Sequence, residues 1–356
     1  MFSFFNAGSG TNQSNHMYKL GPVHQGILER GCKTGSSSYL LFPCRVGAFT
    51  AIIGKHYANF DSSNFPFSYI NEKGGKSILT PAMNFFTTGT FRDGLKWVAR
   101  DRRKSKEKLD FIIFDVLSPY TLQKVIKGQK ILIELYENTD RNQEYVIHNN
   151  IHIKRLLLKT GKRYYQLIID KYFGDVLVSR IKKENPKELQ DVFKYGKEPE
   201  MAKAEWIDLS GLLCSKKRIE LLISDVTNGK IDSFEKLHNE FEKIYNCYEN
   251  DVWNWFLTNY KQLNGCELHE NSDEDLIKFF DNWKESSLKL LNMVSQDSQK
   301  EFEGNVRIGF GIDGNADADF ESVRGTFEKN AFILKIKDEI DSVNSKYEKL
   351  KKMISI

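Results

Sequence analysis

The sequence has no long apolar run, and this absence limits the class of protein. No stretch approaches the roughly 20 apolar residues that a membrane-spanning helix needs, so we expect no membrane partner. The first residues also lack the basic segment and the small-residue cleavage site of a secretory signal. With 40% hydrophobic and 28% charged residues, the composition is typical of a globular protein.

Cysteine is scarce and the net charge is small. Five cysteines, an odd number without CxxC spacing, predict free thiols in a reducing compartment rather than a disulfide framework or a zinc site. We therefore expect a cytoplasmic protein. The 52 basic and 48 acidic residues leave a net charge of +4, which is too weak a field to indicate nucleic acid as a partner. The length of 356 residues predicts two or three packed units.

A six-residue periodicity runs through residues 28–56. Aliphatic side chains or threonine recur every six residues, and four places after each comes a mostly small side chain: Leu28, Thr34, Leu40, Val46 and Ile52, followed by Cys32, Ser38, Cys44, Thr50 and His56. A parallel β-helix of triangular section needs an aliphatic residue inside each coil and a small one near the corner. The pattern therefore predicts hexapeptide repeats of a left-handed β-helix with Leu40, Val46 and Ile52 inside. The alternative is a run of short antiparallel strands. His56 should point outward or end the repeat.

The periodicity becomes helical further along the chain. Ser118 is the expected N-cap of a helix that begins at Pro119, and one face of this helix carries Leu122, Val125, Ile126 and Leu132. The fold class that we predict is a β-solenoid plus α-helices. We expect β-helix coils at residues 1–60, an excursion with a basic segment at residues 61–110, and a mostly α-helical domain at residues 111–356.

Several blocks of the chain resemble a known family. They include "MFSFFNAGSGTNQSNHMYKLGPVHQG", "VGAFTAIIGKHY", "DFIIFDVLSPYTLQK" and "GFGIDGNADADFESVRGTFEKN". The sequence resembles an uncharacterised bacterial family, typical of Bacteroidetes, whose members carry a long left-handed β-helix followed by a helical region. In architecture this family is similar to acyltransferases built on the same β-helix, but the resemblance brings no established activity.

The resemblance implies further coils before Met1. We therefore expect either that the chain is the C-terminal part of a longer protein, or that a separate polypeptide supplies the missing coils. An open β-helix exposes unpaired strand edges and an apolar cross-section. Self-association, or docking of an upstream β-helix segment, is the partner prediction that follows.

Two histidines near the start are candidate catalytic bases. In acyltransferases built on this solenoid, a histidine between two coils removes a proton from the acceptor hydroxyl or amine. The resemblance makes His16 and His24 the candidates, with acyl-CoA or an acyl carrier protein as donor and a sugar or nucleotide-sugar as acceptor. Alternatively, both histidines order an asparagine-rich surface by hydrogen bonding.

A basic segment follows at residues 92–103. Its candidate anion-binding residues are Arg92, Lys96, Arg100 and Arg103. If the segment is helical, the first three lie on one face and could bind the phosphate of a nucleotide-sugar or of a phosphopantetheine arm. The alternative is an internal ion-pair network, because Asp93 and Asp101 supply counter-charges.

We predict neither a dinucleotide site nor a metal site. The "GFGIDG" at residues 309–314 matches GxGxxG formally, but the acidic residues around it would repel a pyrophosphate. The sequence thus favours an acyltransferase-like enzyme acting on a sugar or nucleotide-sugar. The alternative is a non-catalytic binding or assembly module that uses the solenoid to oligomerise.

Overall fold

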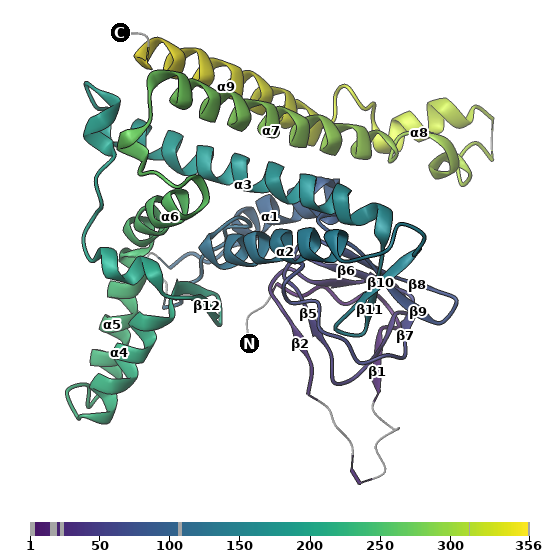
Figure 1. The fold of residues 1–356 in the computed structure, drawn as a ribbon. Coiled ribbons are helices and arrows are strands. Elements are labelled where there is room, and N and C mark those ends of the chain that lie inside the picture. Colours follow the sequence, from purple (N-terminus) through teal and green to yellow (C-terminus); the bar gives the residue numbers. More distant parts are fainter. Residues whose placement is uncertain (1–3, 15–19, 22–24, 106–108, 313, 355–356) are drawn as a thin grey trace.

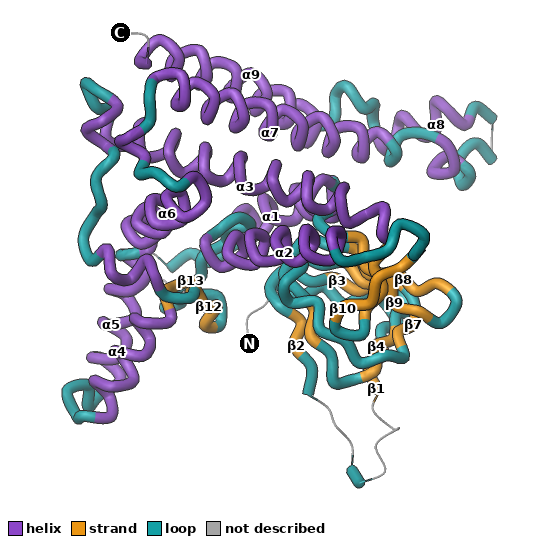
Figure 2. The backbone as a smooth tube through the Cα atoms, viewed as in Figure 1, coloured by secondary structure: helices purple, strands orange, loops and turns teal. Residues whose placement is uncertain are grey.

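The computed structural model describes residues 4–14, 20–21, 25–105, 109–312 and 314–354 (Figure 1). Strands gather in the N-terminal part and long helices follow (Figure 2). The strands are β1 (Asn12–Ser14), β2 (Ile27–Leu28), β3 (Lys33–Thr34), β4 (Tyr39–Leu41), β5 (Arg45–Val46), β6 (Ala51–Ile53), β7 (Lys55–His56), β8 (Tyr69–Lys73), β9 (Lys76–Thr80), β10 (Tyr145–His148), β11 (Ile151–Lys154), β12 (Trp206–Leu209) and β13 (Leu212–Ser215).

The α-helices are α1 (Thr88–Arg100), α2 (Pro119–Glu137), α3 (Arg155–Glu184), α4 (Lys216–Thr227), α5 (Phe234–Asn246), α6 (Tyr248–Asn264), α7 (Asp273–Gln299), α8 (Ala316–Arg324) and α9 (Ala331–Ile354). Short 3-10 helices are η1 (Met83–Phe86), η2 (Leu189–Val192), η3 (Pro199–Lys203), η4 (Leu268–Glu270) and η5 (Gly304–Arg307). Among the described residues, no helix is both long enough and apolar enough to cross a membrane.

The strands of the N-terminal part form small sheets. Parallel pairs join β2 to β5, β3 to β6 and β4 to β7. The side chains of Leu40, Val46 and Ile52 are completely buried. The parallel pairing and the inward direction of these three residues are therefore confirmed.

The prediction of a truncated left-handed β-helix is nevertheless wrong. The structure is a mixed α/β fold with sheets of order β1-β4-β7, β10-β11-β9-β8-β6-β3, β12-β13 and β2-β5. The early strands have only two or three residues, and antiparallel hairpins, not further coils, extend the largest sheet. The repeat ends at His56, which is buried and hydrogen-bonds Ser77 at 2.9 Å instead of pointing outward.

Hairpin turns set the direction of these later strands. Between β8 and β9 both turn residues, Gly74 and Gly75, have positive φ, as tight two-residue hairpins require. Asn149 and Asn150, the turn residues between β10 and β11, also have positive φ. The second hairpin then joins the first, because β11 pairs with β9 in parallel.

The long helices stack in layers beside the sheets. Figure 1 shows α9 and α7 above α3, with α2 between α3 and the strands. Gly174 allows α3 to approach α7 closely, since a Cβ at this position would overlap the indole ring of Trp283. Tyr165 ties α3 to the sheet region, because its hydroxyl donates to the carbonyl of Pro66 at 2.9 Å.

The start of α2 is as the sequence predicts. Ser118 precedes the helix with extended backbone, Pro119 is the first helical residue, and the expected apolar face of Leu122, Val125, Ile126 and Leu132 is buried. Further along the chain, Cys247 separates α5 from α6, and α8 ends before Gly325.

Candidate functional site

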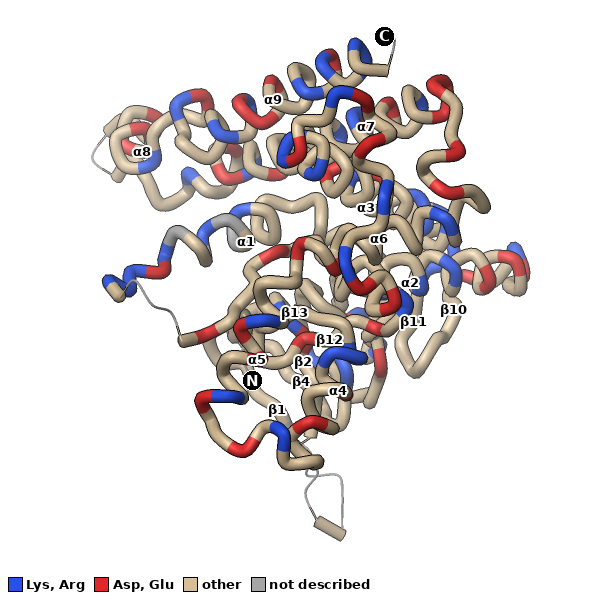
Figure 3. The backbone as a smooth tube through the Cα atoms, turned by 90° about the vertical axis from the view of Figure 1, so that its left-hand side faces the viewer, with Lys and Arg blue, Asp and Glu red and all other residues tan. Residues whose placement is uncertain are grey.

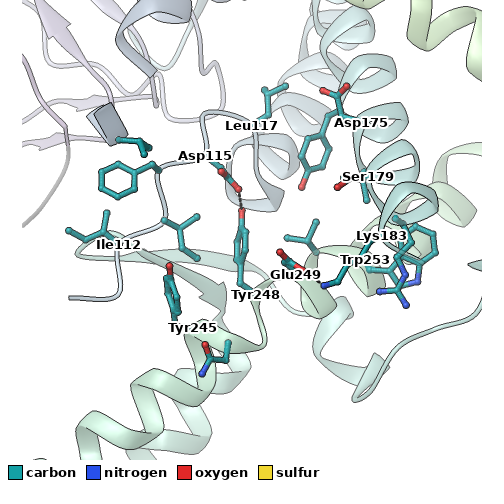
Figure 4. Close-up of a pocket in the computed structure, with 18 residues that line it drawn as sticks. Ile112, Asp115, Leu117, Asp175, Ser179, Lys183, Tyr245, Tyr248, Glu249 and Trp253 are labelled. Carbon is teal, nitrogen blue, oxygen red and sulfur yellow. Dashed lines mark hydrogen bonds and ion pairs between the residues drawn. The ribbon is translucent and has the colours of Figure 1, made fainter. Parts of the chain in front are cut away.

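A pocket of about 690 Å³ lies between residues 112–117, one face of α3 and the junction of α5 with α6 (Figure 4). This volume is in the range that small molecules occupy in protein sites. The polar residues that line it are Asp115, Tyr172, Asp175, Ser179, Arg180, Lys183, Tyr245, Asn246, Tyr248 and Glu249. We call it the central pocket.

Local structure explains why these side chains meet. Tyr172, Asp175, Ser179 and Lys183 are spaced three or four residues apart on α3, so they lie on one face of the helix. The opposite wall comes from an irregular stretch at residues 110–117, which ends where Ser118 caps α2.

Asp115 and Tyr248 form the most direct polar contact across the pocket. The Tyr248 hydroxyl donates to Oδ2 of Asp115 at 2.8 Å (Figure 4). Asp115 is accessible through the pocket, but the surrounding protein excludes much of the water. Loss of hydration raises its pKa, although the Tyr248 hydrogen bond and the charge of Arg30 act in the opposite direction. Asp115 is thus a carboxyl group whose proton is held more tightly than usual.

Arg30 lies behind this wall and is fully buried. Its Nη2 donates to the carbonyl oxygen of Ile113 at 2.5 Å, and its Nε is 3.6 Å from Oδ2 of Asp208. The ring of Phe4 lies 5.2 Å from the guanidinium carbon. Burial lowers the pKa of Arg30. Among the described residues, its Nε and Nη1 have no hydrogen-bond partner.

Tyr172 carries a second unsatisfied group. Its hydroxyl is buried in the pocket wall and has no hydrogen-bond partner within the described part of the chain. Burial, together with the negative charges of Asp115 and Asp175, raises the pKa of Tyr172 well above its ordinary value. The hydroxyl therefore stays protonated and is a donor without an acceptor.

The charged side chains at the other end of the pocket are paired. Lys183 contacts Glu249, and Arg180 contacts Glu184 while its guanidinium carbon lies 5.1 Å from the ring centre of Trp253. Asp175 accepts from Lys171 at 2.7 Å and from Trp283 Nε1 at 2.8 Å. In the part of the chain that the structure describes, no three His, Cys, Asp or Glu side chains gather to hold a metal ion.

The candidate bases His16 and His24 lie outside the described residues. The structure therefore does not bear on their predicted role. The acyltransferase hypothesis, which depends on them, stays a prediction from the sequence.

The basic segment is helical as far as Arg100. Arg92, Lys96 and Arg100 all lie on α1, and Arg92 is 3.7 Å from Glu301. Arg103 follows the helix and pairs with Asp101 at 2.7 Å and with Asp110. Figure 3 shows basic and acidic positions interspersed over this side of the molecule. These ion pairs are consistent with the alternative of an internal ion-pair network. Anion binding by this segment stays a prediction.

Sequence reasoning missed the central pocket. One signal was present: Asp115 is the lone charged residue within "FIIFDVL", and an acidic residue in an apolar run indicates a polar partner. No comparable signal marked Tyr172 or Tyr248, because their meeting depends on how α3 and α6 pack.

The fold and the central pocket define a mixed α/β protein with a candidate ligand site and a buried arginine behind its acidic group. Residues 167–354 match the family model described as "Domain of unknown function (DUF6819)", which covers more than half of the chain. The chain belongs to this family. Residues 1–136 match a second model, "Domain of unknown function (DUF4954)".

A relative in Treponema pallidum (strain Nichols), named "Uncharacterized protein", is 23% identical over 251 residues. The alignment covers 63% of this chain and 34% of the relative, so the chain spans about a third of that protein. No solved structure matches significantly. These matches agree with an uncharacterised family, but they give no support for similarity to β-helix acyltransferases.

Proposed function

We propose that the chain is a binding module for a small polar molecule and that the central pocket is its site. The observation that carries this proposal is the Asp115 carboxyl group, which faces a cavity of about 690 Å³ and has a raised pKa. A concave site with a few converging polar groups, one of them with a perturbed pKa, is the usual form of a ligand site.

An unsatisfied group in the pocket wall supports a functional role. A buried donor without an acceptor destabilises a fold by about 1–3 kcal/mol. Among the described residues, the Tyr172 hydroxyl is such a donor in the wall of this cavity. Such a group needs an explanation, and a ligand that accepts its hydrogen bond would supply one.

Binding fits the pocket better than group transfer does. Among the described residues that line it there is no histidine or cysteine, and Ser179 has no hydrogen-bonded base beside it to activate its hydroxyl. Arg30 and Asp115 come from the region matched at residues 1–136, whereas Tyr172 and Tyr248 come from residues 167–354. Both matched regions are therefore needed to build the site.

We also propose that the protein works in a reducing compartment such as the cytoplasm. All five cysteines are free thiols, and Cys32, Cys44 and Cys214 are buried. Burial raises the pKa of Cys44 and of Cys214 to about 12, so these two thiols stay protonated and unreactive.

The test is ligand-observed NMR with four probes: glucose, citrate, glycerol 2-phosphate and choline. Ser179 is exposed at the pocket, so Ser179→Trp should fill the cavity. We expect at least one probe to bind the wild type and to lose binding in this variant. The matched control is Ser322→Trp, at an exposed position on α8, which should bind as the wild type does. Equal binding by Ser179→Trp, or no binding by the wild type, contradicts the proposal.

A further inference from the structure

The charges of the central pocket nearly balance. Its acidic residues are Asp115, Asp175 and Glu249, and its basic residues are Arg180 and Lys183. Both basic side chains already contact an acidic partner, as described above. These ion pairs offset much of the positive charge that would attract an anion. Among the described residues, Nε of Arg180 is buried and has no hydrogen-bond partner.

An anionic ligand would also meet like charge. A carboxylate or phosphate next to Asp115 would place two negative groups within hydrogen-bond distance, and such groups lack a proton to donate. Two like charges at this separation repel, and more strongly where protein excludes water. Asp175 lies in the same lining and adds to this repulsion.

A cationic ligand gains little from Asp115, because a cation is already present behind it. Arg30 is completely buried, so water and salt screen its charge only weakly. A ligand cation beside Asp115 would be repelled by the positive charge of Arg30, which also acts on Asp115. An ammonium group can also only donate hydrogen bonds.

An uncharged hydroxyl group avoids both problems, because it donates and accepts. Tyr248 occupies Oδ2 of Asp115, which leaves Oδ1 to accept from such a group. The exposed side chains of Ser179 and Asn246 can each donate and accept, and the Tyr245 ring offers an apolar face for C–H groups. We propose that the ligand is an uncharged polyhydroxylated molecule of the sugar or polyol class, an inference that rests on the proposed function.

The experiment measures affinities by ligand-observed NMR for glucose, other common hexoses and myo-inositol. Citrate, glycerol 2-phosphate and choline represent the charged classes. We expect at least one uncharged probe to bind, the charged probes not to bind, and Asp115→Ala to weaken binding at least tenfold. The matched control, Asp338→Ala, changes an exposed acid on α9 and should leave binding unchanged. Circular dichroism checks that each variant is folded.

The outcomes separate the ligand class from the proposed function. If a charged probe alone binds, and Ser179→Trp abolishes that binding, the function stands and the ligand class is wrong. If a sugar binds Asp115→Ala as tightly as it binds the wild type, the role of Asp115 in recognition is wrong. If no probe binds the wild type, both proposals fail.

Discussion

The hydroxyl of Tyr248 and the carboxyl group of Asp115 meet at 2.8 Å although 133 positions separate them in the chain. This hydrogen bond joins the first residue of α6 to the irregular stretch before α2. It places a carboxyl group with a raised pKa at the wall of a cavity, and several consequences can be measured.

Asp115 should make stability depend on pH. Its pKa in the folded chain is raised above the ordinary value of 3.8, so the folded chain binds this proton more tightly than the unfolded chain does. The contribution of Asp115 to the free energy of unfolding is therefore greatest below pH 3.8 and is lost as the pH rises through the raised value.

The Asp115→Asn variant isolates this contribution, because it cannot ionise. Its stability relative to the wild type should increase between pH 4 and pH 7.5, as measured by urea unfolding at both values. A constant difference between the two proteins would contradict the raised pKa. The control is Asp338→Asn, which makes the same substitution at an exposed position of α9.

Tyr172 and Tyr165 allow a matched comparison of two buried hydroxyls on α3. The Tyr165 hydroxyl has an acceptor, and the Tyr172 hydroxyl has none in the described part of the chain. Tyr165→Phe should reduce the free energy of unfolding by about 1–2 kcal/mol, whereas Tyr172→Phe should leave it unchanged or raise it by up to about 1 kcal/mol. Urea titrations of both variants decide this. An equal loss in both would show that the Tyr172 hydroxyl is satisfied.

Gly174 should not tolerate alanine. Because the added methyl group would overlap the indole ring of Trp283, α3 and α7 must separate, and we expect a loss of about 1–3 kcal/mol. The control is Gly89→Ala on α1, where the nearest atom to a new Cβ is Nζ of Lys33 at 3.5 Å. That variant should be neutral, or stabilised by up to about 1 kcal/mol, because alanine favours the helix. Thermal unfolding of both variants tests the contrast.

Arg30 should be essential for folding. Arg30→Met removes the positive charge beside Asp208 and Asp115, and loss of one partner of a buried ion pair destabilises by about 3–5 kcal/mol. Arg92→Met changes an arginine that is half exposed beside Glu301, and a surface ion pair contributes about 0–1 kcal/mol. The measurement is the denaturant concentration at the unfolding midpoint of the Arg30→Met and Arg92→Met variants. Similar losses would mean that Arg30 is not held as a buried charge.

The sequence was informative where a signal is local. The Ser118 and Pro119 pair marked the start of α2, and the six-residue spacing identified Leu40, Val46 and Ile52 as buried residues of parallel strands. The helix-start signal and the six-residue spacing both arise from residues that are close together in the chain. The same spacing did not determine the fold class, because strand pairing beyond His56 depends on hairpins whose turns carry no six-residue signal.

The central pocket could not be predicted for a related reason. Its polar side chains come from widely separated segments, and their meeting depends on the packing of α3 and α6 against residues 110–117. Cys247 divides what looks like one helix, so that α6 begins at Tyr248. Because helical periodicity continues through Cys247, no pattern in the sequence predicts the break between α5 and α6.

The parallel pairing of β9 with β11 also has a consequence for the order of events during synthesis. The side of β9 that receives β11 has no partner until residues 151–154 have left the ribosome, since α1 and α2 are made in between. At roughly 5–20 residues per second, this interval is about 4–14 seconds. For that time the nascent chain presents an open strand edge, on which a strand of a neighbouring chain can pair.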